Sequence, residues 1–283
     1  MFWQRFLCVA VILVLSSVFA EAADKGEYYL FKPTPVELMR DMSTDRPDRT
    51  ESPYTVDAGH IQVETSLLDY TYEHHNPDEP QVRTDNFSFI PSNLKVGLLN
   101  NTDLQIVLEP FIHEYSRDDG SRSEKSGFGD IQTRLKVNVW GNDGGATALA
   151  VMPFIKFPTN NHALGKDDSE GGVIIPLGVA LPADWNMGVM SEFDFNKNAE
   201  DHHYHTEYVQ SITFSHTIVG ELSGYVEFFS NVSAEEKAKW VSTVDIGLTY
   251  ALSKDLQLDM GVNIGTTAAA EDLNPFCGLS WRY

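Results

Sequence analysis

The stretch Val244-Asp245-Ile246-Gly247-Leu248-Thr249-Tyr250 decides the fold class of this chain. Apolar side chains occupy every second position, and the positions between them are polar or small. The next stretch, Leu256 to Ile264, repeats the pattern, with Asp259 and Asn263 on its polar positions. A period of two is the period of a β-strand whose two faces meet different surroundings. The sequence therefore predicts adjacent strands, each with one apolar and one polar face.

The same alternation extends outward from this stretch in both directions. Short connections alternate with longer polar ones, which is typical of a transmembrane barrel with tight periplasmic turns and longer extracellular loops. We therefore expect an all-β fold, a transmembrane antiparallel β-barrel of about 12 strands over residues 57–283. The expected strands lie near 59–73, 84–99, 103–116, 127–140, 146–157, 170–181, 185–197, 203–218, 221–232, 239–251, 255–267 and 274–283.

The final strand carries Cys277, Leu279, Trp281 and Tyr283 on one face. A terminal aromatic residue on an alternating strand resembles the signal that outer-membrane barrels present to their insertion machinery. An even number of strands also places both chain ends on the periplasmic side. We expect a monomer whose partners are outer-membrane lipid, the outer-membrane insertion machinery and a small-molecule solute.

The first residues read as an export signal. Arg5 precedes an apolar run from Phe6 to Phe19, and Ala20 and Ala22 form a small-residue cleavage site. We expect residues 1–22 to be a signal peptide, which predicts export to the outer membrane of a Gram-negative bacterium. Cys8 lies inside the apolar run. Its removal leaves Cys277 alone, so the mature chain is expected to contain no intramolecular disulfide.

Residues 23–56 do not alternate and contain four prolines, which predicts an irregular periplasmic segment before the first strand. Two interpretations remain open, a strap or plug at the barrel mouth and a flexible leader. The charges of this segment suit a plug, because they are able to pair with charged groups inside the barrel. The plug candidates are Asp45, Arg46, Asp48, Arg49 and Glu51.

The chain is strongly acidic, with 20 Lys and Arg against 41 Asp and Glu, a net charge of −21. Such acidity disfavours nucleic acid as a partner. Charges on the strands are expected to face the lumen, since a basic residue facing lipid at the bilayer midplane costs about 2–4 kcal/mol. They either line an open pore, with a slight preference for cations, or cross-link a filled interior. The lumen candidates are Glu64, Asp130, Arg134, Lys136, Glu192, Asp194, Glu207, Glu227, Asp245 and Asp259.

Two local patterns suggest metal binding or catalysis, but their residue spacing does not establish either. His202, His203 and His205 form a histidine-rich loop beside acidic residues, so a transition-metal site is an alternative to a solvated loop. Ser215 and His216 suggest an outer-membrane acyl hydrolase. However, adjacent strand residues point to opposite faces, so these two cannot pair as nucleophile and base. We expect no enzyme activity and no cofactor.

A longer block is more specific. It runs from Thr44 to Val56 as Thr-Asp-Arg-Pro-Asp-Arg-Thr-Glu-Ser-Pro-Tyr-Thr-Val, followed by Gly-His-Ile-Gln-Val-Glu at residues 59–64. It resembles the outer-membrane family of meta-pathway phenol-degradation transporters, as do the turn at 98–104 and Gly-Phe-Gly-Asp at 127–130. The resemblance implies an exported barrel that passes aromatic or other apolar small molecules. It implies no catalytic residues.

The resulting hypothesis is an outer-membrane channel for passive uptake of small solutes, aromatic or hydrophobic ones included. The first alternative is a closed or plugged barrel with a structural or secretion-related role. The second is a surface lipid hydrolase. The sequence does not name the solute.

Overall fold

A computed structural model describes residues 25–283 except 76–80, 119–120, 163, 199–202 and 236–237. The expected signal peptide, residues 1–22, lies outside the described residues. Helix is confined, in the described part of the chain, to the single turn η1 (Val36–Leu38). No described helix has the length and apolar character needed to span a membrane.

Within the described residues, fifteen strand segments form one antiparallel sheet. They are β1 (Ile61–Glu73), β2 (Arg83–Phe89), β3 (Ser92–Leu99), β4 (Thr102–Leu108), β5 (Phe111–Arg117), β6 (Arg122–Gly127), β7 (Ile131–Trp140), β8 (Thr147–Phe157), β9 (Glu170–Ala180), β10 (Asn186–Lys197), β11 (Tyr204–Val219), β12 (Leu222–Ser233), β13 (Val241–Ser253), β14 (Leu256–Gly265) and β15 (Leu273–Arg282).

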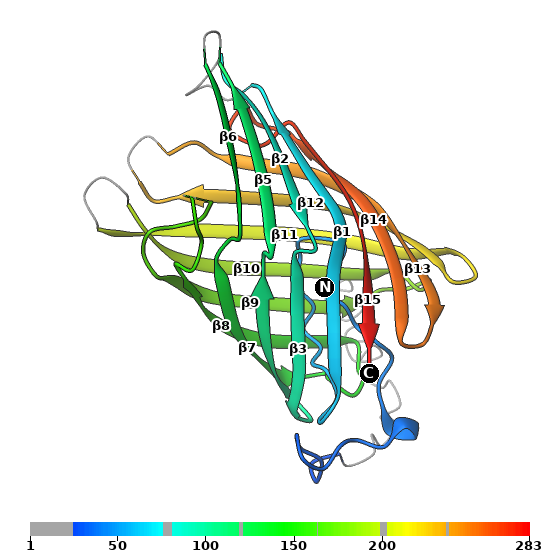
Figure 1. The fold of residues 1–283 in the computed structure, drawn as a ribbon. Helices are drawn as coiled ribbons and strands as arrows, with labels where there is room; N and C mark the ends of the chain where they lie inside the picture. The colour runs from blue at the N-terminus through cyan, green and yellow to red at the C-terminus, as the bar shows by residue number, and fades with distance from the viewer. Residues whose placement is uncertain (1–24, 76–80, 119–120, 163, 199–202, 236–237) are drawn as a thin grey trace, which may run out of the picture.

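The sheet closes on itself because β1 pairs with β15, from Gln62↔Arg282 to Tyr72↔Leu273. The closed ring consists of β1, β3, β4 and β7 to β15, which is a barrel of twelve strands (Figure 1). Closure leaves the ring without an unpaired edge. The predicted twelve-stranded antiparallel barrel is confirmed.

Three expected strands are interrupted where the sequence predicted continuity. The strands expected at 84–99 and 103–116 break at Pro91 and Pro110, because proline has no N–H to give to the ladder. Ile90, before the first of these prolines, has a φ of 58°. The strand expected at 127–140 breaks at 128–130 between β6 and β7.

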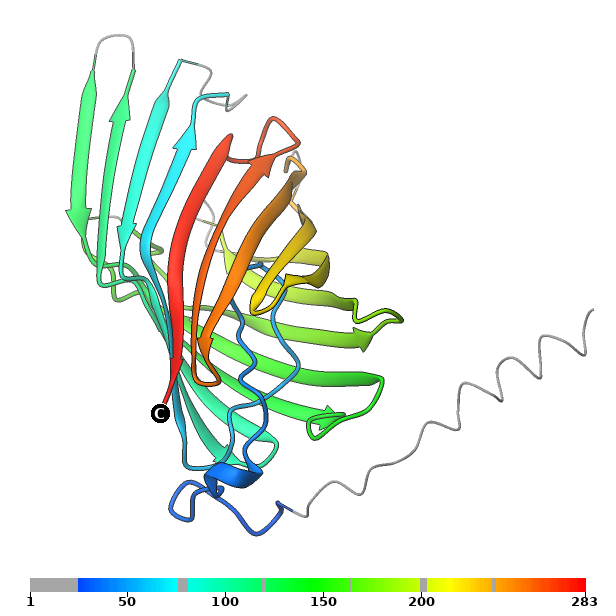
Figure 2. The same cartoon turned by 90° about the vertical axis from the view of Figure 1, so that its right-hand side faces the viewer.

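The breaks separate a small sheet from the ring. Beyond them, β2 pairs with the upper half of β1, β5 pairs with β2, and β6 pairs with β5. We call residues 68–73 of β1 together with β2, β5 and β6 the leaf. The leaf rises past the rest of the barrel on the side of the longer loops, which is the extracellular side of such a barrel (Figure 2).

Burial is inverted relative to a water-soluble protein. Large polar side chains are enclosed, with Lys95 2% and Lys136 0% exposed. Apolar side chains such as Ile246 and Met260 are exposed on the outer wall. This is the arrangement required when the outer wall contacts lipid, and it follows the alternation seen in the sequence.

The segment before β1 enters the barrel. Residues 40–57, here named the strap, run through the lumen as the blue chain inside the ring in Figure 2. Before it, residues 25–39 form a periplasmic leader, in which the Leu30 N–H donates to the Leu98 carbonyl at the end of β3. The predicted irregular segment therefore lies mostly inside the barrel, where it meets the side chains of the wall.

Candidate functional site in the barrel lumen

One side of the lumen is basic where it meets the strap. Lys95 on β3 and Lys136 on β7 both reach Asp45, at Nζ–Oδ distances of 2.5 and 2.7 Å. Lys95 also pairs with Glu64 on β1, whose carboxylate accepts the backbone N–H of Asp45. All four side chains are almost fully enclosed. Because buried charges are stable only when paired, Asp45 is the counter-ion that this wall requires.

Glu51 extends the same contact along β7. Its carboxylate pairs with Arg134, which also donates to Gln132 at 3.0 Å. The Glu51 N–H lies 3.4 Å from the sulfur of Met190 on β10. Asp45 and Glu51 of the strap thus face β3 and β7, whereas Asp48 lines a cavity together with Thr213 on β11.

The opposite side of the lumen is acidic. Arg46 donates to both carboxylate oxygens of Asp259 on β14, at 2.6 and 3.2 Å, and to Ser66 at 2.6 Å. Its guanidinium lies over the ring of Phe276, 5.5 Å from the centroid. Position 278 requires glycine, because a Cβ there would lie 2.3 Å from the backbone oxygen of Thr65 and 2.4 Å from an Arg46 nitrogen.

Arg49 also contacts the acidic side of the lumen. Its side chain lies 3.8 Å from Asp245 on β13 and over the ring of Phe229 at 4.8 Å. Glu227 on β12 accepts the backbone N–H groups of Arg49 and Thr50 at 2.8 and 2.7 Å. Basic residues and backbone donors of the strap therefore face β12 to β14.

A separate ion cluster fastens the periplasmic end of the strap. Asp57 lies 3.1 Å from Arg40 and 3.7 Å from Arg282, while Lys25 lies 2.9 Å from Asp143 in the β7–β8 turn. Burial alone would raise the pKa of Asp143, but its hydrogen bonds to Lys25 and Asn100 and the charge of Arg40 outweigh that effect and lower its pKa. The cluster ties leader, strap, turn and final strand together.

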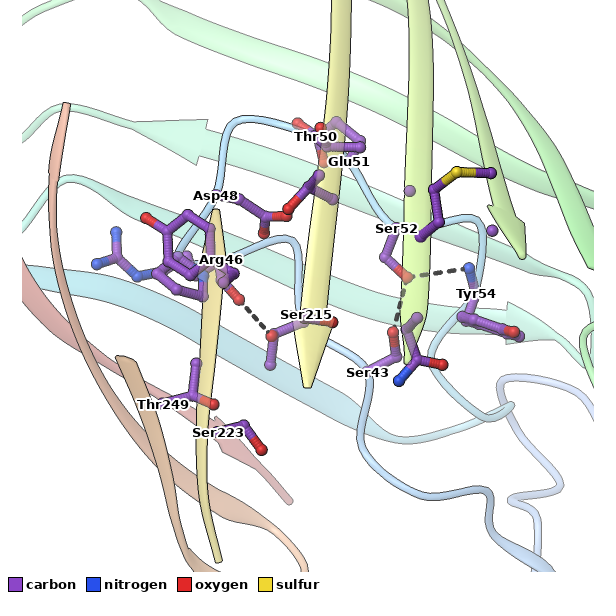
Figure 3. A pocket seen from close by; sticks show the side chains of 18 of the residues that line it. Ser43, Arg46, Asp48, Thr50, Glu51, Ser52, Tyr54, Ser215, Ser223 and Thr249 are labelled. Atoms are coloured by element: carbon purple, nitrogen blue, oxygen red, sulfur yellow. Dashed lines mark hydrogen bonds between the residues drawn. The ribbon is translucent and has the colours of Figure 1, made fainter. Parts of the chain in front are cut away.

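A cavity of about 410 Å³ lies between the strap and the ends of β9 to β14 near the short turns (Figure 3). Its lining is rich in hydroxyl groups, and Arg46, Asp48 and Glu51 add charge. The hydroxyl-bearing lining residues are Ser43, Thr44, Thr50, Ser52, Tyr54, Thr213, Ser215, Ser223, Tyr225 and Thr249. Among the described atoms, the Tyr225 hydroxyl is buried without a hydrogen-bond partner at the edge of this cavity.

The lumen wall also carries an apolar patch. It is formed by inward side chains of β8 to β12, and its members are Met152, Phe154, Ile174, Met190, Val209 and Phe229. Met190 contacts Glu51 of the strap. An apolar patch beside a hydroxyl-lined cavity suits a molecule with an apolar body and a polar group.

The remaining lumen candidates lie toward the extracellular side. Glu192, Asp194 and Glu207 come from β10 and β11, where Asp194 and Glu207 are cross-strand partners. Glu207 accepts a hydrogen bond from Asn231 at 2.7 Å. Asp130 lies outside the strands, in the break before β7, where it accepts the backbone N–H of Lys166 at 2.8 Å and secures the β8–β9 loop.

The histidine-rich loop is only partly described, because His202 lies outside the described residues. His205 bonds Asn198 and lies 3.3 Å from Glu207, which ties the loop to the β11 strand. Within the described residues, no group of three or more His, Cys, Asp or Glu side chains is placed to hold a metal ion.

The side chains of Ser215 and His216 lie on opposite faces of the barrel wall. Ser215 lines the lumen cavity, whereas His216 stacks on Trp185 and bonds the Ala183 carbonyl at 3.1 Å. They do not form a nucleophile and base pair.

Lys95 and Asp103 are charged residues of the lumen wall that the sequence-based set omitted. Lys95 alternates with Leu94 and Val96, so the period of two was sufficient to place it inside. Asp103 accepts the Val56 N–H at 3.0 Å and was also readable from the alternation of β4. Both signals lay in strands that the sequence had already identified.

Comparison with known proteins agrees with this architecture. The family model described as "Putative MetA-pathway of phenol degradation" matches residues 44–283. The fold is similar to the COG4313 outer membrane channel from Pseudomonas putida F1, with a TM-score of 0.56, 13% identity, and 85% of this chain and 100% of that chain covered. It is also similar to the NanC porin, with a TM-score of 0.50, 10% identity, and 78% and 98% covered. No curated protein matches the sequence.

Proposed function

The chain belongs to the family described as "Putative MetA-pathway of phenol degradation", and from this we propose that it is a passive channel of the Gram-negative outer membrane for small solutes. The observation that carries the proposal is the 410 Å³ cavity enclosed between strap and wall inside a closed barrel. We propose that the chain reaches this membrane through the signal peptide at residues 1–22 and functions there as a monomer without a cofactor.

The lining of the lumen supports a solute class. Hydroxyl groups surround the cavity, and the buried Tyr225 hydroxyl beside it has no hydrogen-bond partner among the described atoms. The neighbouring apolar patch favours an apolar body over a sugar or an ion. We propose a small molecule with an aromatic or aliphatic body and one or two hydrogen-bonding groups.

The strap is proposed to set the width of the channel. Its charges are matched to the wall on both sides, so it is held across the lumen rather than hanging from the mouth. A solute crossing the membrane must pass between strap and wall, along the cavity.

Single-channel conductance of the purified protein in planar bilayers tests both proposals. We expect discrete steps in the wild-type protein and substantially larger steps after deletion of residues 40–57. The barrel of the deletion variant is first checked by its heat-dependent gel mobility and β-sheet circular dichroism. Equal conductance in a correctly folded deletion variant would rule out the strap as the restriction.

A reversible lock is the matched control for the deletion. The hydroxyls of Thr50 and Ser211 on β11 lie 2.6 Å apart, so cysteines at both positions, with Cys277→Ser, should form a disulfide that fixes the strap. We expect the oxidised double variant to conduct as the wild type does. If conduction requires the strap to leave, oxidation should silence the channel and reduction restore it.

The second candidate function is a closed barrel with a structural or secretion-related role. The dense pairing of the strap favours it, because four strap charges, those of Asp45, Arg46, Arg49 and Glu51, lie beside wall charges of opposite sign. A folded wild-type barrel that remains silent in bilayers, while the deletion variant conducts, supports this function over the channel. We propose no enzyme activity, because Ser215 and His216 occupy opposite faces.

A further inference from the structure

The outer face of the leaf changes character along its length. Because strand side chains alternate, Arg83, Phe87 and Leu68 belong to rows that face away from the lumen. The rows follow one another from an apolar base, through aromatic residues, to a basic tip. A lipid has the same order, from its apolar acyl chains to its charged headgroup.

The base of the outer face is a hollow of about 730 Å³ in the lipid-facing wall. Its lining is almost entirely apolar, and outward side chains of β1, β2, β14 and β15 contribute to it. They include Leu68, Tyr70, Phe87, Met260, Val262 and Cys277. A β-bulge between Ser66 and Leu68 lies where β1 passes from the ring into the leaf. A hollow in a surface that contacts lipid is filled by a hydrocarbon chain, because no polar group is present to hold water there.

The tip is a cross-strand row of three arginines. Arg83 is the partner of Arg117, and Arg117 is the partner of Arg122. Arg117 and Arg122 are exposed. In a chain of net charge −21, three aligned arginines on one face are a local concentration of positive charge. Arginine binds phosphate oxygens with two parallel hydrogen bonds, which makes such a row suitable for a phosphorylated group.

The row below the arginines contains carboxylates on the same face. Asp85 accepts from Arg83 at 3.0 Å and from the Tyr70 hydroxyl at 2.5 Å, and Glu124 lies 3.8 Å from His113. Arg83 also lies over the Tyr72 ring at 5.0 Å. These contacts fix Arg83 in place, while Arg117 and Arg122 occupy the outer part of the row.

The separation of hollow and arginine row matches one leaflet. From the row of Leu68 to the row of Arg83 there are six residue steps along β1 and β2, or roughly 20 Å of strand. Half of a bilayer including its headgroups is also about 20 Å thick. A lipid with its chain in the hollow would therefore have its headgroup beside the arginines.

We propose that the outer face of the leaf binds a phosphorylated, multiply acylated lipid of the outer leaflet, with an acyl chain in the hollow and a phosphate on Arg117 and Arg122. The site goes beyond the channel function and uses none of the lumen residues. It rests on the proposed membrane location, with the leaf on the extracellular side.

Binding of a synthetic bisphosphorylated, hexa-acylated glycolipid to the purified full chain in detergent tests the site. The Arg117→Gln/Arg122→Gln variant should bind it at least about tenfold more weakly. The control is Lys125→Gln/Lys166→Gln, which removes the same charge from the opposite face of β6 and from another loop, and should bind as the wild type does. The same glycolipid without phosphates should bind both variants and the wild type equally.

The hollow is tested separately. Cys277→Trp fills it, whereas Ile155→Trp adds the same ring to an exposed position on β8 outside it. We expect only Cys277→Trp to reduce lipid binding, with both variants showing wild-type heat-dependent gel mobility. Equal loss in both, or unchanged binding in the double arginine variant, overturns the site. Inorganic phosphate binding as tightly as the glycolipid also overturns it, since the arginines would then hold phosphate alone.

Discussion

The two sides of the lumen treat the strap in opposite ways. The β3 and β7 side presents cations, among them Lys95 and Lys136, and is met by an acidic residue of the strap. The β12 to β14 side presents carboxylates, Asp245 and Asp259 among them, and is met by arginines. This difference shows that the strap does not simply fill the lumen. Four of its charged residues, Asp45, Arg46, Arg49 and Glu51, each lie beside wall residues of opposite charge.

Asp45→Asn should have the largest effect on stability, because it leaves Lys95 and Lys136 buried without their shared carboxylate. We expect a loss of about 3–5 kcal/mol in the free energy of unfolding. Urea denaturation in detergent micelles, followed by tryptophan fluorescence, measures it. A loss below about 1 kcal/mol would show that Glu64 alone neutralises this wall.

Arg46→Gln tests the acidic wall and should cost less, about 1.5–3 kcal/mol, because it removes the ion-pair partner of one carboxylate, Asp259, whereas Asp45→Asn removes that of two lysines. The decisive variant exchanges the charges, with Arg46→Asp combined with Asp259→Arg. We expect the exchange to recover part of the stability lost in either single variant, as measured by the same denaturation. Additive losses would mean that the Arg46 contact is not a specific pair.

Arg49→Gln should have a smaller effect, about 0.5–1 kcal/mol, because its nearest carboxylate distance is 3.8 Å. The backbone bonds of residues 49 and 50 to Glu227 remain in this variant. Glu227→Gln is the comparison, since it weakens those backbone bonds instead. A larger loss in Arg49→Gln than in Glu227→Gln would reverse the assigned order.

The smallest effect is expected from Asp143→Asn at the periplasmic cluster. The pKa of Asp143 is lowered in the folded protein, so its contribution is present above the unfolded pKa of about 3.9 and is lost as pH falls through the lower folded value. Proteolysis of the leader between pH 7 and pH 3 reads out this attachment. The wild type should become more sensitive at the acidic end, and the variant should already be sensitive at pH 7.

Strand faces were predictable from sequence, whereas the pairing of the strap was not. The period of two placed Asp245 and Asp259 inside because a single strand contains the necessary information. The partner of Asp259, Arg46, is 213 residues away, and nothing local selects it over Arg49. The sequence shows that the strap is charged. Which wall residue each strap charge pairs with depends on how the closed ring arranges the strands.

The leaf was missed for a different reason. Pro91 and Pro110 lay inside strands expected to be continuous, and each proline alone would have allowed a strand break to be predicted. To predict the leaf from them, the third break at 128–130 would also have to be recognised. A single break only kinks a strand, whereas breaks at the same height in neighbouring strands separate a small sheet from the ring. Asp130 was assigned to the lumen from strand parity, yet it lies in that break.

The pairing of β1 with β15 and the contacts of the strap join the same two ends of the described chain. The strap directly precedes β1, and its contacts reach β12 to β14. Until both have formed, Lys95 and Asp259 lack their strap partners. The slowest step of folding is therefore expected to be the joint capture of strap and seam, which brings together the most distant parts of the chain.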